Sequence, residues 1–129
     1  MMNTLTIIAV ASGGAIGATL RMLISSSINK QYVHSIPFGT LGVNLLGSLI
    51  MGMLFAYFYL HTTFSPALKT FLITGILGAF TTYSTFAMES FILLNTQQYI
   101  HAFINMALNL FGTIFFAGIG YLIIMKTTN

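Results

Sequence analysis

Polar and small side chains recur every four residues along two otherwise apolar segments of this chain. They are Thr40, Asn44, Ser48 and Gly52 in one segment, and Asn105, Asn109, Thr113 and Ala117 in the other. Residues four apart lie on one face of a helix, so each segment carries a narrow polar track. Burying an amide without a hydrogen-bond partner costs free energy, so these side chains should have polar partners. The partners would be either other helices or the contents of a polar pathway. Two such tracks in one small protein favour a pathway.

A third segment, between residues 75 and 89, combines glycines, hydroxyl side chains and aromatic rings. Its sequence is GILGAFTTYSTFAME, and it ends in Glu89, the only acidic residue of the chain. Gly and Thr form helices less readily than Ala, so we predict a break in this helix near Gly78–Thr82. Unwound backbone inside a membrane frees carbonyl groups, which suit a cation. The alternative is a kinked helix whose backbone is satisfied by its own Ser and Thr side chains.

Glu89 and Arg21 are charged residues within apolar segments. A lone intramembrane acid is a candidate functional residue, and we expect Glu89 to bond Thr85 or Asn44, or else to lie at the membrane interface. Arg21 either concentrates anions in a vestibule or extends to the lipid headgroups.

The composition predicts that these residues are positioned by helices in lipid. Of 129 residues, 57% are hydrophobic and only 4% are charged, whereas soluble domains carry about 25% charged residues. A membrane span needs about 20 apolar residues. We therefore predict an all-α integral membrane protein, a single domain over residues 1–129. Its four expected transmembrane helices cover about Leu5–Ile28, Phe38–Leu60, Ala67–Leu94 and Tyr99–Met125, the first being a retained helix rather than a signal peptide.

The composition also argues against several kinds of protein. The chain has no cysteine, so it offers no disulfide framework and no thiolate metal site. A net charge of +3 is too small and too scattered to suggest a nucleic-acid partner. The sequence shows no Ser/His/acid set, metal cluster or phosphate-binding loop, so we do not expect an enzyme.

Basic residues are balanced between the two sides of the predicted bundle. Lys69 and Lys126 lie on one side, and Arg21 and Lys30 lie on or near the other. With so small a difference between the two sides, the positive-inside rule predicts almost no preference for either orientation. Either the chain has one weakly biased orientation, or it inserts both ways and pairs with its inverted copy.

Three runs of sequence resemble the Fluc/CrcB family of bacterial fluoride channels. They are GGAIGATLR at residues 13–21, GTLGVNLLG at residues 39–47 and GILGAFTTYSTF at residues 75–86. Each glycine pattern alone is weak in a membrane protein, but the three occur in order and the resemblance covers essentially the whole chain. It implies a fluoride-selective channel of the bacterial inner membrane that exports cytoplasmic fluoride down its electrochemical gradient. It also implies an antiparallel, dual-topology homodimer with two pores and a structural sodium ion (Na+) at the dimer interface.

The resemblance further implies roles for individual residues. The backbone carbonyls of Gly78 and Thr81 would hold the sodium ion. The pore or its vestibule would be lined by Asn44, Tyr83, Ser84, Thr85, Phe86, Glu89, Thr113 and Arg21. The family usually has Phe where this chain has Tyr83, so an ion could meet either the ring edge or the added hydroxyl.

Fluoride is small and strongly hydrated, and an unassisted anion in a low-dielectric medium costs on the order of tens of kcal/mol. The pore must therefore replace water with donors. Asn44 has two N–H donors, and Ser84, Thr85 and Thr113 have hydroxyls. Aromatic rings add a weakly positive edge.

Two alternatives from other classes remain open at the level of sequence. Small multidrug exporters are also four-helix antiparallel dimers, but they need a carboxylate in the first helix, where this chain has Arg21. A structural or regulatory membrane subunit without transport is the other alternative. The paired polar tracks argue against it.

Overall fold

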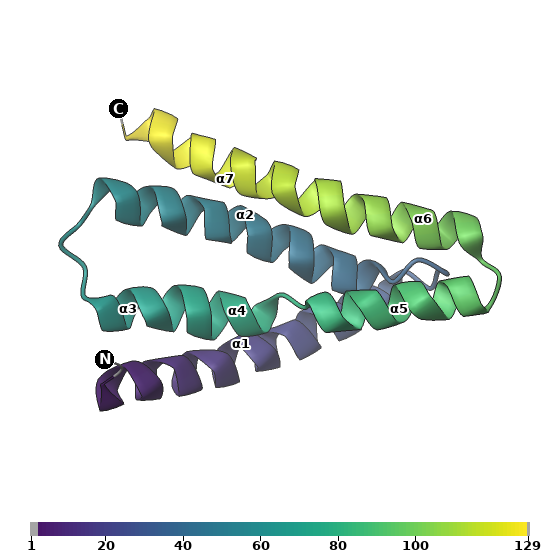
Figure 1. The fold of residues 1–129 in the computed structure, drawn as a ribbon, viewed down its shortest axis with the longest axis horizontal. Coiled ribbons are helices and arrows are strands. Elements are labelled where there is room, and N and C mark those ends of the chain that lie inside the picture. The colour runs from purple at the N-terminus through teal and green to yellow at the C-terminus, as the bar shows by residue number, and fades with distance from the viewer. Residues whose placement is uncertain (1–2, 129) are drawn as a thin grey trace.

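The computed structural model describes residues 3–128 and consists of helices joined by short loops (Figure 1). The helices are α1 (Thr4–Gln31), α2 (Phe38–Leu60), α3 (Pro66–Thr70), η1 (Phe71–Leu77), α4 (Gly78–Phe80), α5 (Tyr83–Asn95), α6 (Tyr99–Ala107), η2 (Leu108–Gly112) and α7 (Thr113–Thr127). The two segments η1 and η2 are π-helical.

These elements form four helices within the described residues that are long and apolar enough to cross a membrane. The first and second are α1 and α2. The third span, Pro66–Asn95, joins α3, η1, α4 and α5, and the fourth span, Tyr99–Thr127, joins α6, η2 and α7. The four predicted spans are confirmed. The third begins one residue before the predicted Ala67, because the Ser65 side chain caps it by accepting a hydrogen bond from the Leu68 N–H at 3.2 Å.

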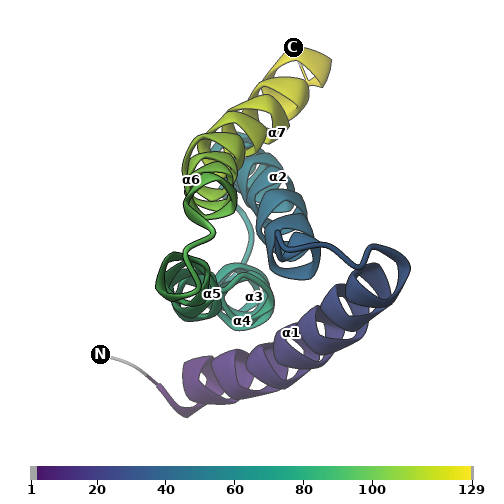
Figure 2. The ribbon, with the colours of Figure 1, turned by 90° about the vertical axis from the view of Figure 1, so that its right-hand side faces the viewer.

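The third span is broken in its middle, as the sequence predicted. Thr81 (φ −83°, ψ 155°) and Thr82 (φ −148°, ψ 115°) have extended backbones, whereas Gly78 (φ −62°, ψ −35°) is still helical. The break therefore occupies the last two residues of the predicted stretch. It appears as a thin connection between α4 and α5 in Figure 1, and the end-on view of Figure 2 shows α5 displaced sideways from α3 and α4.

Glycines allow helix backbones to touch at two crossings. A Cβ on Gly17 of α1 would collide with the backbone of η1. Where α2 crosses α7, a Cβ on Gly52 would meet the Ala117 carbonyl, and one on Gly120 would meet the Leu49 carbonyl. Small residues permit this close approach of helices in lipid. As a result η1 is held against α1, and α2 is held against α7.

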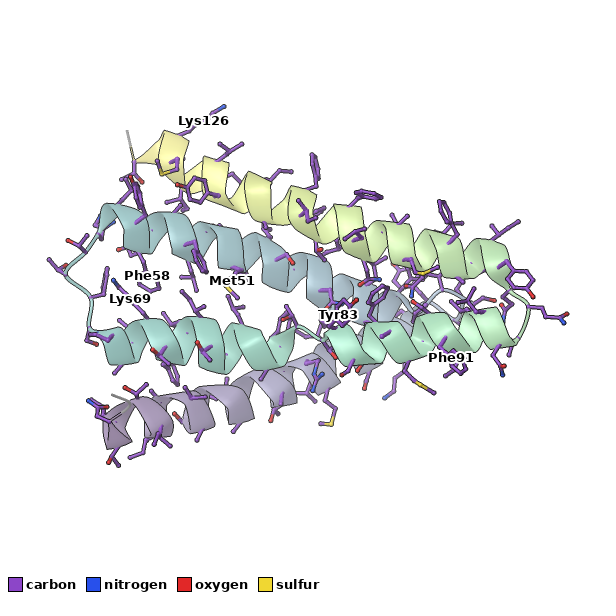
Figure 3. The ribbon with its side chains drawn as sticks, viewed as in Figure 1. Met51, Phe58, Lys69, Tyr83, Phe91 and Lys126 are labelled. Atoms are coloured by element: carbon purple, nitrogen blue, oxygen red, sulfur yellow. The ribbon has the colours of Figure 1, made fainter. Side chains whose placement is uncertain are left out.

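Figure 1 places the start of α1, the α2–α3 loop and the end of α7 at one end of the bundle. Lys69 and Lys126 lie toward that end, and Lys30 lies at the last turn of α1, at the other end. Lys69 makes a cation–π contact, since its Nζ lies 5.7 Å from the ring centroid of Phe58 (Figure 3). Two lysines therefore lie at one end of the bundle and Lys30 at the other, while Arg21 lies ten residues before the end of α1.

Candidate functional site

The Asn44 side chain of α2 pairs with the broken backbone of the third span. Its Oδ1 accepts a hydrogen bond from the Thr82 N–H at 2.8 Å, and its Nδ2 donates to the Thr82 carbonyl at 3.1 Å. Both residues are buried. Unpaired backbone groups in the interior are costly, so this two-bond clamp, the Asn44 clamp, stabilises the extended conformation of the break.

A chain of buried side-chain amides continues from the clamp into the fourth span. Asn44 Nδ2 also donates to Asn109 Oδ1 at 2.9 Å. Asn109 Nδ2 in turn donates to the backbone carbonyl and Oδ1 of Asn105, at 3.0 and 3.1 Å, and Asn105 Nδ2 donates to Ser90 Oγ at 3.0 Å. An asparagine amide has two N–H donors, and both donors of Asn44 are engaged here. The three asparagines of the polar tracks therefore connect helices to one another in this structure.

A cavity of about 500 Å³ lies beside the break. Its lining includes four of the predicted pore residues, namely Asn44, Tyr83, Phe86 and Thr113. The rings of Tyr83 and Phe86 pack edge to face with centroids 5.5 Å apart. Figure 3 shows Tyr83 next to the break, and its side chain is 80% exposed. The structure thus brings the two predicted aromatic residues to one open cavity.

A second cavity, of about 270 Å³, is lined by Arg21, Thr40 and Thr85 among others. Arg21 therefore borders this cavity. Thr82 belongs to the lining of both cavities, so the Asn44 clamp lies where the two spaces approach each other.

Glu89 has a different partner from those expected. Its Oε1 accepts a hydrogen bond from Thr40 Oγ1 at 2.7 Å, so the expected bond to Thr85 or Asn44 is wrong. No hydrogen-bond partner within residues 3–128 reaches the buried Oε2 of the same carboxyl. Thr40 lies one helical turn before Asn44 on the polar track of α2, and this position was the signal that could have identified it.

The three hydroxyl side chains predicted as donors are in three different situations. The Thr113 hydroxyl donates to the Asn109 carbonyl of its own helix. Thr85 Oγ1 accepts from Thr82 Oγ1 at 2.9 Å, which leaves the hydroxyl hydrogen of Thr85 available to donate. Ser84 is exposed and lines neither of the two cavities.

The break also changes the surroundings of the two carbonyls expected to bind a cation. In a continuous helix the Gly78 carbonyl would accept from the Thr82 N–H, and the Thr81 carbonyl would accept from the Thr85 N–H. The Thr82 N–H donates to Asn44 instead, and the Thr85 N–H is directed to Thr82 Oγ1 at 3.4 Å. Both carbonyls have therefore lost their helical donors. Carbonyl oxygens can replace the hydration shell of a hard cation, so Gly78 and Thr81 fit such a ligand.

Comparison with known proteins identifies the family. A family model described as CrcB-like protein, Camphor Resistance (CrcB), matches residues 8–121. The chain belongs to the CrcB family. This confirms the resemblance seen in the sequence and displaces the multidrug-exporter and structural-subunit alternatives.

Relatives within the CrcB family match almost the full length of the chain. A protein of Sulfurimonas denitrificans is 56% identical over 123 residues, which cover 95% of each chain. A Campylobacter jejuni protein is 50% identical over 123 residues, covering 95% of this chain and 98% of the relative. A Pseudoalteromonas translucida protein is 42% identical over 117 residues, covering 91% and 98%. All three relatives carry the name fluoride-specific ion channel FluC.

Proposed function

We propose that this multi-pass membrane protein is the subunit of a fluoride channel, through which fluoride leaves the bacterial cytoplasm down its electrochemical gradient. The observation that carries the proposal is the similarity to relatives named fluoride-specific ion channel, at up to 56% identity over 95% of both chains. The structure adds two cavities that approach each other at a break in the third span.

The side chains around these cavities suit a strongly hydrated anion. Arg21 places a positive charge at the cavity that also contains Thr85, and this charge would concentrate anions there. The free hydroxyl hydrogen of Thr85 can replace a lost water molecule. Tyr83 and Phe86 offer ring edges in the other cavity. Several weak sites in series allow an ion to leave as well as to enter.

The role of Tyr83 is proposed to be that of a ring edge, because the family generally functions with Phe at this position. Fluoride flux should therefore survive the Tyr83→Phe change. A large loss of flux with an intact assembly would instead assign the contact to the hydroxyl.

Selective flux is the direct test of the proposed function. Purified protein reconstituted into liposomes should release fluoride, measured with a fluoride electrode, and should leave chloride inside under the same gradient. Empty liposomes processed in parallel give the background leak. Equal release of both anions, or fluoride release no faster than from empty liposomes, would overturn the proposal.

The partner of the chain is proposed to be a second, inverted copy. Tyr83 exposes 80% of its side chain, and a phenol facing lipid within a span would leave a polar group unsatisfied. A second subunit would cover this side chain and close the cavity beside it. Balanced basic residues at the two ends of the bundle favour insertion in both orientations, and hence an antiparallel pair.

Orientation can be measured with reporter fusions at the C-terminus. We expect reporters for both sides of the membrane to be active in one population. Two lysines added next to Lys126 should shift nearly all molecules to one orientation, because cytoplasmic loops and tails retain positive charge. A wild-type C-terminus confined to one side would contradict dual topology.

A sodium ion is proposed at the centre of this dimer. The Gly78 and Thr81 carbonyls would hold it, since the break has taken away their helical donors. When bound, it would supply a fixed positive charge that links two subunits and favours anions nearby. Gly78 is exposed and Thr81 is partly exposed in the single subunit, so a partner could cover both residues.

A further inference from the structure

We infer that Asn109 and Asn105 are positioning residues that fix the orientation of the Asn44 amide, and through it the conformation of the break. Neither was among the residues expected to bind fluoride. The effect of this amide relay, Thr82–Asn44–Asn109–Asn105–Ser90, on fluoride flux rests on the proposed function. The relay itself rests only on hydrogen bonds within the chain.

Backbone groups fix the orientation of the two amides at the centre of the relay, Asn44 and Asn109. At one end, the Thr82 N–H can only donate and the Thr82 carbonyl can only accept, so Asn44 must present Oδ1 to the first and Nδ2 to the second. Further along, Asn109 Nδ2 lies 3.0 Å from the Asn105 backbone carbonyl, which can only accept. This contact turns Asn109 Oδ1 toward Asn44 Nδ2. The backbone contacts thus turn the two amides so that each presents the complementary group to the other, and the bond from Asn109 reinforces the orientation that Asn44 needs at Thr82.

The local structure of the fourth span supports a positioning role. Asn109 belongs to the π-helical segment η2, and such segments are rare and frequently occur at functional sites. The four side chains of the relay come from α2, η2, α6 and α5. All are buried, and each bond lies between 2.8 and 3.1 Å. The relay therefore joins three of the four spans and extends from the break along α5 and the fourth span.

Releasing Asn44 would change the backbone that it holds. Without an acceptor at Asn109, one N–H of Asn44 loses its partner, and the amide gains freedom to rotate away from Thr82. The Thr82 N–H would then spend more time without an acceptor, and the extended backbone of the break would lose the contact that stabilises it. Asn109 thus acts through Asn44 on the backbone of the break.

Hydrogen exchange at the Thr82 amide tests the relay without any ion flux. Asn44, Asn109 and Asn105 are each changed to Leu, which is close to Asn in length but neither donates nor accepts. The relay predicts that exchange at the Thr82 amide accelerates most in Asn44→Leu, less in Asn109→Leu and least in Asn105→Leu. The expected acceleration in Asn109→Leu is about tenfold. Asn95→Leu, the same change at the exposed end of α5, should leave exchange at Thr82 unchanged.

A purely packing role of Asn109 and Asn105 predicts no such ranking, because both side chains are buried and Leu fills a similar volume. Faster exchange in Asn105→Leu than in Asn109→Leu, or unchanged exchange in Asn109→Leu, would overturn the inference. If a Leu variant fails to assemble by size-exclusion chromatography, Ala at the same three positions is ranked instead. Fluoride flux in liposomes should fall in the same order. A wild-type chain without fluoride flux would overturn the proposed function while leaving the exchange ranking as evidence for the relay.

Discussion

Replacing Asn44 with aspartate should reduce fluoride flux by about 100-fold or more. The change keeps the shape of the side chain but replaces its NH₂ group with an oxygen. This oxygen would face the Thr82 carbonyl and Asn109 Oδ1, which are both acceptors. Each buried polar group left without a partner costs about 1–3 kcal/mol, and about 1.4 kcal/mol corresponds to a tenfold change. A negative charge beside the proposed path adds repulsion of the anion.

The measurement is the initial rate of fluoride efflux from liposomes with equal amounts of assembled protein. Asn95→Asp makes the same exchange at an exposed position and should conduct like the unmodified chain. Size-exclusion chromatography separates loss of conduction from loss of folding. Full flux in Asn44→Asp would exclude both the Asn44 clamp and the adjoining cavities from the fluoride path.

Replacing sodium with a large organic cation should stop fluoride flux and weaken the dimer. The physical reason lies in the Gly78 and Thr81 carbonyls, whose helical donors are directed to other acceptors. Without a cation, two copies of these carbonyls would face each other across the proposed interface with their negative ends together. Each buried acceptor without a partner costs about 1–3 kcal/mol, so the dimer should dissociate at concentrations at which it otherwise persists.

Flux and dimer affinity are measured on the same preparation in N-methyl-D-glucamine and in sodium. Restoring sodium should restore both, which separates loss of the ion from denaturation. Dimer affinity and flux that are the same in both media would remove sodium from the proposal. The fluoride path through one subunit would still stand, because its two cavities are lined by side chains of a single chain.

The fold was largely predictable from the sequence because lipid imposes simple rules. Long apolar segments separated by polar residues gave four spans, and each was found within a few residues of its predicted bounds. The break in the third span was predictable because Gly78, Thr81 and Thr82 are weak helix formers close together in the sequence. The π-helical segments were not predictable, since one extra residue in a helical turn leaves no mark on an apolar pattern.

The candidate site was predictable in its members but not in their partners. Tyr83 and Phe86 share a cavity as expected, because residues three apart on a helix face the same way. The engagement of Asn44 with Thr82, and of Glu89 with Thr40, depends on how separate helices are rotated against each other. A single sequence does not show that rotation. A hydrogen-bond donor that the sequence assigns to an ion can therefore be bonded to another group of the protein.

The interlocked glycines of α2 and α7 are relevant to how such a protein could select an ion by its radius. Gly52 lies against the Ala117 carbonyl and Gly120 against the Leu49 carbonyl, so neither helix can slide without driving backbone into backbone. One wall of the larger cavity, which carries Asn44 and Thr113, is therefore stiff. A pore that selects ions by radius needs at least one wall that keeps its position, and here α2 and α7 form that wall. The opposite wall is the broken third span. Any change in the width of the cavity must therefore come from that span or from a facing subunit.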